Sequence, residues 1–189
     1  MPHCSAELTE EDLVIRAQQG DANAFGDLYE RHLDKIYRYV FYRVGDVAEA
    51  EDVTETVFLK AWEALDRYRL RDIPFSAWLY RISHNAIIDR YRAQKDMLVS
   101  LESQPDLRDW ADGPEDQLDA LESSESLAWA ISQLAPDYQQ VLALRFVSGL
   151  SHGDTARIMS RSEEAVRVLQ HRALRVLREQ LTQRIRTHV

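Results

Sequence analysis

The sequence predicts an all-α protein with two helical domains, an N-terminal helical bundle and a C-terminal helix-turn-helix, joined by a flexible acidic linker. Hydrophobic residues recur at helical spacing in both halves, and no useful length of chain alternates as a strand would. The stretch between the halves is acidic, contains Pro105 and Gly113-Pro114, and lacks a sustained period. The expected boundaries are a disordered tail at residues 1–8, domains at 9–95 and 122–189, and the linker at 96–121.

Four helices are expected in the first domain, each delimited by a cap or a breaker. Thr9 with Asp12 three residues later resembles a capping box that opens the first helix. Glycine-aspartate pairs break the chain after the first and second helices, and Pro74 suits the first turn of the fourth. The expected helices cover residues 9–17, 24–43, 47–68 and 74–94.

The second domain ends in two helices joined by a short break. Pro136 begins a helix that Gly149 ends, while Ser151 and Ser162 can cap the next two. The last helix sorts its residues by chemistry, with an apolar side made by Val166, Leu169, Ala173, Val176 and Leu177. Its opposite side carries Glu164, Arg167, Val168, His171, Arg175 and Arg178. Such a helix-turn-helix is suited to enter the major groove of DNA.

The charge is unevenly distributed along the 189 residues, whose formal net charge is −9. Residues 67–95 carry 7 basic and 2 acidic side chains, and residues 161–189 carry 7 and 3. The stretch 96–126 between them carries 1 basic and 10 acidic side chains. Two basic blocks can neutralise phosphate, although each alone is also compatible with an ordinary solvated surface.

The helix expected at 47–68 carries an unusual outward face. Opposite its apolar side lie Asp52, Glu55, Leu59 and Trp62. Exposed apolar residues among acids suggest a docking surface, since tryptophan is a frequent interface anchor. The alternative is that another helix of the domain covers Trp62.

The helix expected at 74–94 has a polar stripe between two apolar sides. The stripe consists of Arg81, Asn85, Ile88 and Arg92. Two guanidinium groups beside an amide suit phosphate contacts around a base-reading group, and aromatic residues such as Tyr68 could stack on unpaired bases. The same aromatic residues could instead form the core.

No catalytic, metal or cofactor site emerges from the sequence. The six histidines are scattered and the one cysteine, Cys4, lies near the N-terminus. Glycine-rich phosphate loops, nucleophile elbows and paired cysteines are lacking. We expect a binding protein that is not an enzyme. Without an apolar membrane span or a signal-peptide core, it is expected in the cytoplasm with no membrane insertion.

Several segments resemble the extracytoplasmic-function (ECF) sigma factors, two-domain initiation factors of bacterial transcription. The resemblance is carried by DANAFGDLYERHLDKIYRY, AEDVTETVFLKAWEALDRYR, PFSAWLYRISHNAIIDRYR, LAPDYQQVLALRFVSGLS and SEEAVRVLQHRAL. Departures from the family pattern are Glu55 for glutamine, Thr56 for an acid, Gly153 and Asp154 for paired acids, and Ser160 for the turn glycine.

The resemblance implies a role for each surface. Asp52, Glu55 and Leu59 would contact the clamp helices of the largest subunit of core RNA polymerase. Tyr68 and Asn85 would hold a flipped −10 base of the promoter, with Arg81 and Arg92 on the backbone. The −35 element would be read by Arg167, Val168, His171 and Arg172. The linker would follow the polymerase's nucleic-acid channel. Family members are commonly held inactive by an anti-sigma factor, which this sequence does not identify.

Two other functions compete with this interpretation. A repressor or activator would bind DNA through residues 122–189 and use 9–95 for sensing or dimerisation. The basic stripe of Arg81, Asn85 and Arg92 disfavours it, because a sensor domain needs no second nucleic-acid surface. An enzyme with a DNA-binding tail is disfavoured by the absence of a catalytic constellation.

Overall fold

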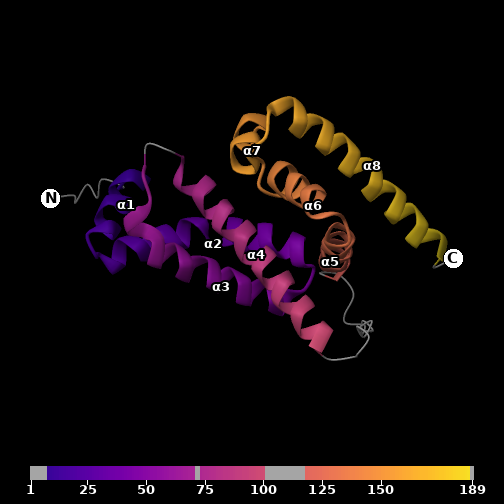
Figure 1. Ribbon diagram of the computed structural model, residues 1–189, viewed down its shortest axis with the longest axis horizontal. Helices are drawn as coiled ribbons and strands as arrows, with labels where there is room; N and C mark the ends of the chain where they lie inside the picture. Colours follow the sequence, from indigo (N-terminus) through magenta and orange to yellow (C-terminus); the bar gives the residue numbers. More distant parts are fainter. Residues whose placement is uncertain (1–7, 71–72, 101–117, 188–189) are drawn as a thin grey trace.

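The computed structural model describes residues 8–70, 73–100 and 118–187, and every regular element in these ranges is helical (Figure 1). The predicted pair of helical domains is confirmed, with α1–α4 in the first and α5–α8 in the second. In chain order the helices are α1 (Glu10–Gln18), α2 (Ala22–Val44), α3 (Val47–Ala64), α4 (Phe75–Ser100), α5 (Leu118–Ser132), α6 (Pro136–Leu142), α7 (His152–Met159) and α8 (Glu163–Thr187). Residues 1–7 of the expected tail and 101–117 of the expected linker lie outside the described residues.

The caps of the first domain follow the sequence closely. The Thr9 hydroxyl accepts from the Asp12 backbone N–H, and the Asp12 carboxylate accepts from the Thr9 backbone N–H, so the predicted capping box is confirmed. Asp21 caps α2 by accepting from the N–H groups of Asn23 and Ala24. Gly45 ends α2 at a φ of 77°, in the left-handed region that favours glycine.

The third helix ends earlier than expected, and helices cover the described residues at both ends of the expected linker. The α-helix stops at Ala64, followed by a 3-10 turn at Leu65–Arg67. Tyr68 leaves the helix because its ring packs in the core. Residues 96–100 continue α4, and 118–121 belong to α5. A change in charge marked the predicted linker boundaries, but acidic residues do not by themselves end a helix.

The helix after Pro136 is also interrupted, contrary to the continuous helix expected up to Gly149. It changes at Ala143 into a π-helical turn, Ala143–Val147. The Ser148 N–H donates to the Ala143 carbonyl at 2.9 Å, five residues back. Gly149 then takes a φ of 66° and turns the chain toward α7.

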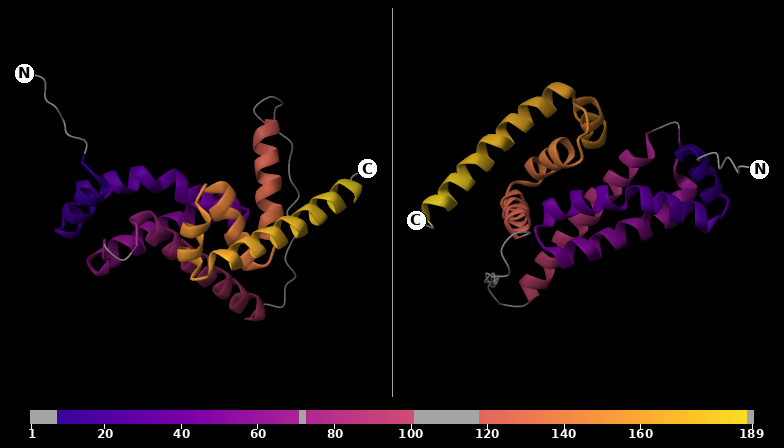
Figure 2. Two further views of the ribbon diagram at one scale, coloured as in Figure 1. Left: turned by 90° about the horizontal axis from the view of Figure 1, so that it is seen from above. Right: turned by 180° about the vertical axis from the view of Figure 1, so that it is seen from behind.

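One hydrophobic core extends across both domains. The cluster that contains Leu28, Ile36 and Phe58 also includes Ala143, Leu144 and Ile158 of the second domain. A second cluster, with Val141, Val166, Ala173 and Leu177, holds α6 and α8 together. The second domain therefore packs on the first through α5, α6, the π turn and α7, while α8 lies on the outer side (Figures 1 and 2).

Candidate nucleic-acid and polymerase interfaces

Helix α8 presents a broad polar face away from the rest of the molecule. Val166, Ala173 and Leu177 anchor the helix from its buried side. The four side chains expected to read the −35 element are exposed, namely Arg167, Val168, His171 and Arg172, and so are the candidate DNA contacts Glu164 and Arg175 on the same helix. The sequence pattern therefore assigned the two sides of this helix correctly.

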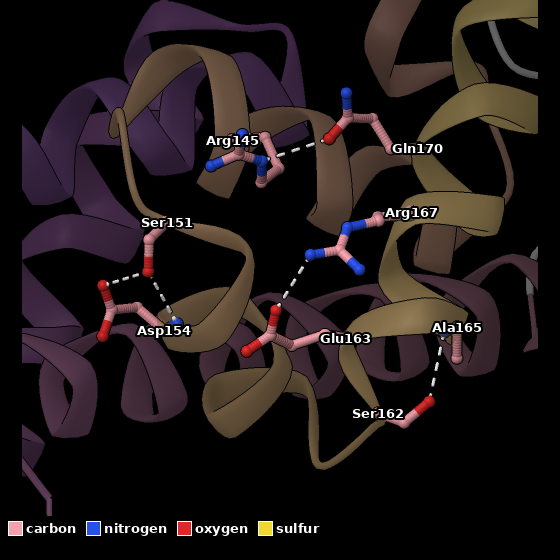
Figure 3. Close-up of polar contacts among 8 residues, drawn as sticks. All are labelled: Arg145, Ser151, Asp154, Ser162, Glu163, Ala165, Arg167 and Gln170. Carbon is pink, nitrogen blue, oxygen red and sulfur yellow. Dashed lines mark hydrogen bonds and ion pairs between the residues drawn. The ribbon is translucent and has the colours of Figure 1, made fainter.

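The start of α8 is fixed by a cap. The Ser162 hydroxyl accepts from the Ala165 N–H at 3.2 Å (Figure 3). The pKa of the Glu164 carboxyl is lowered by a hydrogen bond to its own backbone N–H and by the Ser162 hydroxyl. Glu164 therefore adds negative charge to the predicted DNA-reading face, where it disfavours close approach of a phosphate.

Two side-chain contacts orient residues of the helix-turn-helix (Figure 3). Arg167 Nη2 donates to Glu163 Oε2 at 3.2 Å, one turn earlier on the exposed surface of α8. Arg145 Nε, from the π turn, donates to Gln170 Oε1 at 3.1 Å. The sequence analysis missed Arg145, since a single arginine in an apolar segment gives little indication of what it contacts.

The turn between α7 and α8 accommodates the two departures from the family pattern. Ser160 adopts φ 54° and ψ 45°, so a serine occupies the left-handed position where the family has glycine. Gly153 leaves room for a neighbouring carboxylate, because a Cβ there would lie 3.1 Å from Glu163 Oε1. Ser160 therefore takes a left-handed conformation at this turn, and the absence of a side chain at Gly153 gives the Glu163 carboxylate room beside α7.

The stripe on α4 is partly covered by the second domain. Arg81 is half-buried, and its Nη2 donates to the Arg157 carbonyl oxygen of α7 at 2.8 Å. Asn85 and Arg92 are exposed, and Ile88 is half-buried. A cleft of about 350 Å³ separates this face from α6 and α7, and it is lined in part by Arg81, His84, Asn85, Gln140, Met159 and Ser160.

Tyr68 is buried, which favours the core alternative that the sequence left open for this ring. It is only 5% exposed, and its ring contacts Phe75 and Trp78, with centroids at 5.5 and 4.8 Å. Its hydroxyl donates to the Ile73 carbonyl oxygen at 2.7 Å. In this structure Tyr68 supports the loop before α4, because the apolar environment favours burial of the ring and the carbonyl satisfies its hydroxyl.

A buried polar group lies behind the α4 stripe. Arg43 is fully buried, and its Nη1 donates to the Tyr39 hydroxyl at 2.8 Å and to His84 Nδ1 at 2.9 Å. Burial and the Arg43 charge together lower the pKa of His84 to about 4. His84 is therefore neutral near pH 7 and accepts through Nδ1. The pattern of the sequence did not identify this pairing of Arg43 with His84.

The outward face of α3 combines acids with exposed apolar surface. Asp52 and Glu55 are exposed, and Leu59 is 58% exposed. Trp62 is 39% exposed and packs on Phe25 of α2, with ring centroids 4.8 Å apart. Another helix therefore covers part of Trp62 and leaves the rest available.

Within residues 8–70, 73–100 and 118–187, no group of three or more histidine, cysteine, aspartate or glutamate side chains could hold a metal ion. None of the helices in those ranges is long and apolar enough to cross a bilayer. Cys4 lies outside the described residues.

Comparisons with known proteins match both halves of the chain. The family model for Sigma-70 region 2 matches residues 28–96, and that for Sigma-70 region 4 matches residues 130–179. The chain is 33% identical over 177 residues to the ECF RNA polymerase sigma factor SigW of Bacillus subtilis, covering 89% of this chain and 94% of that protein. This chain belongs to the ECF sigma factors. The predicted family is therefore confirmed.

Further relatives support the same assignment. The sigma factor is 39% identical over 167 residues to the ECF sigma factor BldN of Streptomyces coelicolor, and it spans 63% of that relative's length. A solved structure of CnrH in complex with the cytosolic domain of CnrY resembles it with a TM-score of 0.69 and 26% identity, covering 90% of this chain and 96% of that one. As an ECF sigma factor, the protein directs RNA polymerase to promoters.

Proposed function

We propose that three helical faces of this sigma factor bind three different partners. The outward face of α3 docks on the clamp helices of the largest subunit of core RNA polymerase. The stripe on α4 contacts the −10 element during promoter opening, and the exposed face of α8 reads the −35 element. The observation that carries this proposal is the presence of two separate arginine-bearing helix faces, one in each matched family region.

The polymerase contact is supported by the composition of the α3 face. Leu59 and Trp62 expose apolar area beside the carboxylates of Asp52 and Glu55. Aromatic and aliphatic anchors contribute much of the energy of an interface, while charges at its edge set orientation and association rate. A basic and apolar helical surface on the polymerase is the partner that fits.

The DNA contacts are divided by chemistry. On α4, Arg81 and Arg92 are placed for phosphate contacts and Asn85 for a base edge. Tyr68 is buried against Phe75 and Trp78, so it contributes to this surface by supporting the first turns of α4 and not as an exposed stacking group. On α8, Arg167, Val168, His171 and Arg172 contact the major groove, with Glu164 and Arg175 at its edges.

Several further properties follow from this assignment. The domain roles are those expected from the sequence: residues 9–95 for polymerase and −10 DNA, and the C-terminal domain for −35 DNA. The protein acts in the cytoplasm, where bacterial transcription takes place, and catalyses no reaction of its own. An anti-sigma factor is a further expected partner, since CnrH was solved in complex with the cytosolic domain of CnrY. The matches to both sigma regions favour the sigma factor over the repressor or activator alternative.

Docking on polymerase can be tested with matched substitutions. Trp62→Ala and Asp52→Arg should each weaken capture of purified core polymerase by at least about ten-fold, since an interface anchor contributes about 2 kcal/mol or more. Trp129→Ala is the control for the first, because Trp129 is also 39% exposed but lies on α5. Glu11→Arg, at an exposed position of α1, controls for charge reversal. Equal capture by all four variants would exclude the α3 face.

Run-off transcription with core polymerase and a promoter library tests the whole function. The unmodified sigma factor should produce discrete transcripts from a subset of sequences. Their −35 and −10 preferences can then be determined together. Binding of the C-terminal domain to DNA without any transcript would contradict the proposed function.

A further inference from the structure

The last turn of α1 is joined to the end of α3 by one side chain. Gln18, the final residue of α1, is half-buried, and its Nε2 donates to the Leu65 and Tyr68 carbonyl oxygens, both at 2.9 Å. A carbonyl oxygen can only accept, so the amide must present its nitrogen, whose two N–H groups match the two acceptors. Gln18 therefore ties α1 to the turn after α3, which lies 47 and 50 residues further along the chain (Figure 1).

Helix α1 is a firm base for this contact, because it packs on the first domain along its length. Leu13 and Val14 are fully buried in the core of that domain. At the opposite end of the helix from Gln18, Glu10 Oε2 lies 2.9 Å from Nε2 of the buried His32 on α2. A donor carried by a packed helix loses little further freedom when it binds, so its hydrogen bonds can order the turn that accepts them.

The turn that accepts these hydrogen bonds leads directly to α4. The Leu65 carbonyl oxygen also accepts from the Tyr68 N–H at 3.0 Å, so the same oxygen closes the 3-10 turn and binds α1. The Tyr68 hydroxyl donates to the Ile73 carbonyl oxygen at 2.7 Å. The Tyr68 ring packs on Phe75 and Trp78, in the first turn of α4. A displacement of the Tyr68 backbone would therefore also move the start of α4.

Two arginines extend from the same turn. Arg67 and Arg69 are exposed on either side of the buried Tyr68. The region that a long side chain can reach is set by the position of its backbone. Ordering of this turn therefore limits where two positive charges can meet a phosphate group.

We propose that Gln18 is a positioning residue for the −10 surface. From α1 it fixes the turn at residues 65–68, and so orients Arg67, Arg69 and the first turn of α4, without contacting DNA itself. The proposal rests on the function proposed for α4 above. The competing explanation is that Gln18 only satisfies two carbonyl groups and contributes to stability alone.

Substitutions at Gln18 are matched by the same substitutions at Gln19, the next residue, which is exposed. Gln18→Leu removes both N–H donors at similar volume, Gln18→Glu keeps the shape but offers only acceptors, and Gln18→Lys restores N–H donors. Donor chemistry predicts that the lysine variant is the mildest, the leucine variant intermediate and the glutamate variant the most severe. Packing alone would instead make the glutamate variant the one most like the wild type.

The free protein reports whether the turn is ordered. Trp78 packs on Tyr68 with ring centroids 4.8 Å apart, so its fluorine NMR signal in fluorotryptophan-labelled protein senses the turn. Gln18→Leu and Gln18→Glu should shift or broaden this signal, which Trp78→Phe assigns. The signal of Trp129, on α5, should not change, and the Gln19 variants should alter neither signal.

Promoter opening is measured with holoenzyme assembled from core polymerase and each full-length variant. The promoter is one selected in the run-off experiment, with a fluorescent adenine analogue in its −10 element. Gln18→Leu should open it about ten-fold more slowly if the ordered turn is then populated about a tenth of the time, and Gln18→Lys should recover most of the rate. Capture of core polymerase and affinity for a −35 duplex should stay at wild-type values, since the hydrogen bonds of Gln18 go to the turn at Leu65 and Tyr68.

Glu10→Ala separates positioning from stability. It removes the contact with His32 at the other end of α1 and leaves the turn at residues 65–68 untouched. Urea unfolding measures the stability lost in each variant. A role in stability alone predicts that opening slows in Glu10→Ala and Gln18→Leu in proportion to that loss, whereas positioning predicts slowing in Gln18→Leu only.

Three results would overturn the proposal. The first is an unchanged Trp78 signal in Gln18→Leu, and the second is slowing in proportion to lost stability in both Gln18→Leu and Glu10→Ala. The third is opening that is no faster with Gln18→Lys than with Gln18→Glu. Failure of run-off transcription by the wild type would instead overturn the proposed function, while the Trp78 signal would still decide whether Gln18 orders the turn.

Discussion

The two candidate DNA surfaces differ in how the protein supports them. The α8 face consists of exposed side chains, with Val168 50% exposed and the neighbouring arginines open to solvent. The α4 face is half-buried at Arg81, His84 and Ile88, and Arg81 is already hydrogen-bonded to α7. One surface is ready to bind, whereas the other contributes to the packing between domains.

This difference predicts different consequences for substitutions on the two surfaces. A surface that is free in the unbound protein can sample duplex DNA directly. A surface engaged in a domain contact must first lose that contact, so DNA that binds the Arg81 guanidinium has to replace its hydrogen bond to the Arg157 carbonyl oxygen. Substitutions on α8 should therefore affect DNA choice directly, while those near α4 should also change the stability of the protein.

Arg167→Ala should have the largest effect on recognition. If this side chain reads a base edge, its loss should cost about 1–3 kcal/mol at the preferred −35 sequence and less at others. Thermal stability should change little, because Arg167 is exposed and its only described ion pair is with Glu163. Binding to a set of −35 duplexes, each differing at one position, measures the effect.

The control for Arg167 is an arginine on the same helix. Arg178→Ala removes the same charge from another exposed position farther along α8. Uniform weakening across all duplexes by Arg167→Ala, with a shallower salt dependence, would assign Arg167 to a phosphate instead.

Acidification should reduce the free energy of unfolding through His84, which belongs to α4. His84 is neutral in the folded protein, with a pKa of about 4 against 6.5 for the unperturbed group, because of burial and Arg43. The unfolded chain then binds more protons between these values, so the free energy of unfolding should fall as the pH decreases from about 6.5 to about 4. Arg43 opposes protonation of His84, and Asp137 of α6 favours it.

His84→Asn provides the comparison for this pH effect. Asparagine keeps an acceptor for Arg43 but does not titrate, so its urea unfolding curve should shift less than the wild-type curve between about pH 7 and about pH 5. A range above pH 5 avoids the titration of carboxylates such as Glu10, whose pKa is lowered mainly by its hydrogen bond to His32. Equal shifts in both proteins would mean that His84 does not contribute.

The sequence predicted local features better than the relation between domains. Spacing placed the faces of α8 correctly, and the Thr9–Asp12 capping box formed as expected. These features depend on residues a few positions apart. The burial of Tyr68 and the Arg81–Arg157 contact depend on residues brought together by packing, which periodicity does not encode.

The same distinction explains what was missed at the sites. In the sequence, Arg43 is one of several charges on an amphipathic helix. In the structure it is buried and donates to His84 of α4, 41 residues away. The sequence correctly predicts that Gly45 ends a helix. It does not predict that the absence of a side chain at Gly45 allows α5 to approach closely. A local pattern can identify a glycine's backbone role without indicating what approaches it.

Gly153→Ala should produce the smallest change in the free energy of unfolding. It tests how firmly the Glu163 side chain is held at the start of α8. Replacing glycine in a helix stabilises it by about 0.5–1 kcal/mol, but the new Cβ would lie 3.1 Å from Glu163 Oε1. Glu163 is flexible and its side chain is 48% exposed, so it can move at the expense of a surface pair with Arg167 worth about 0.3–0.5 kcal/mol. The net result should be a small gain in the free energy of unfolding.

In a Glu163→Ala background the full gain should appear, and the difference between the two values measures the contact between residue 153 and Glu163. A loss of stability in the wild-type background but not in the Glu163→Ala background would mean that this carboxylate is held firmly between α7 and α8, and that the exposed −35 face is more rigidly organised than its solvent exposure indicates.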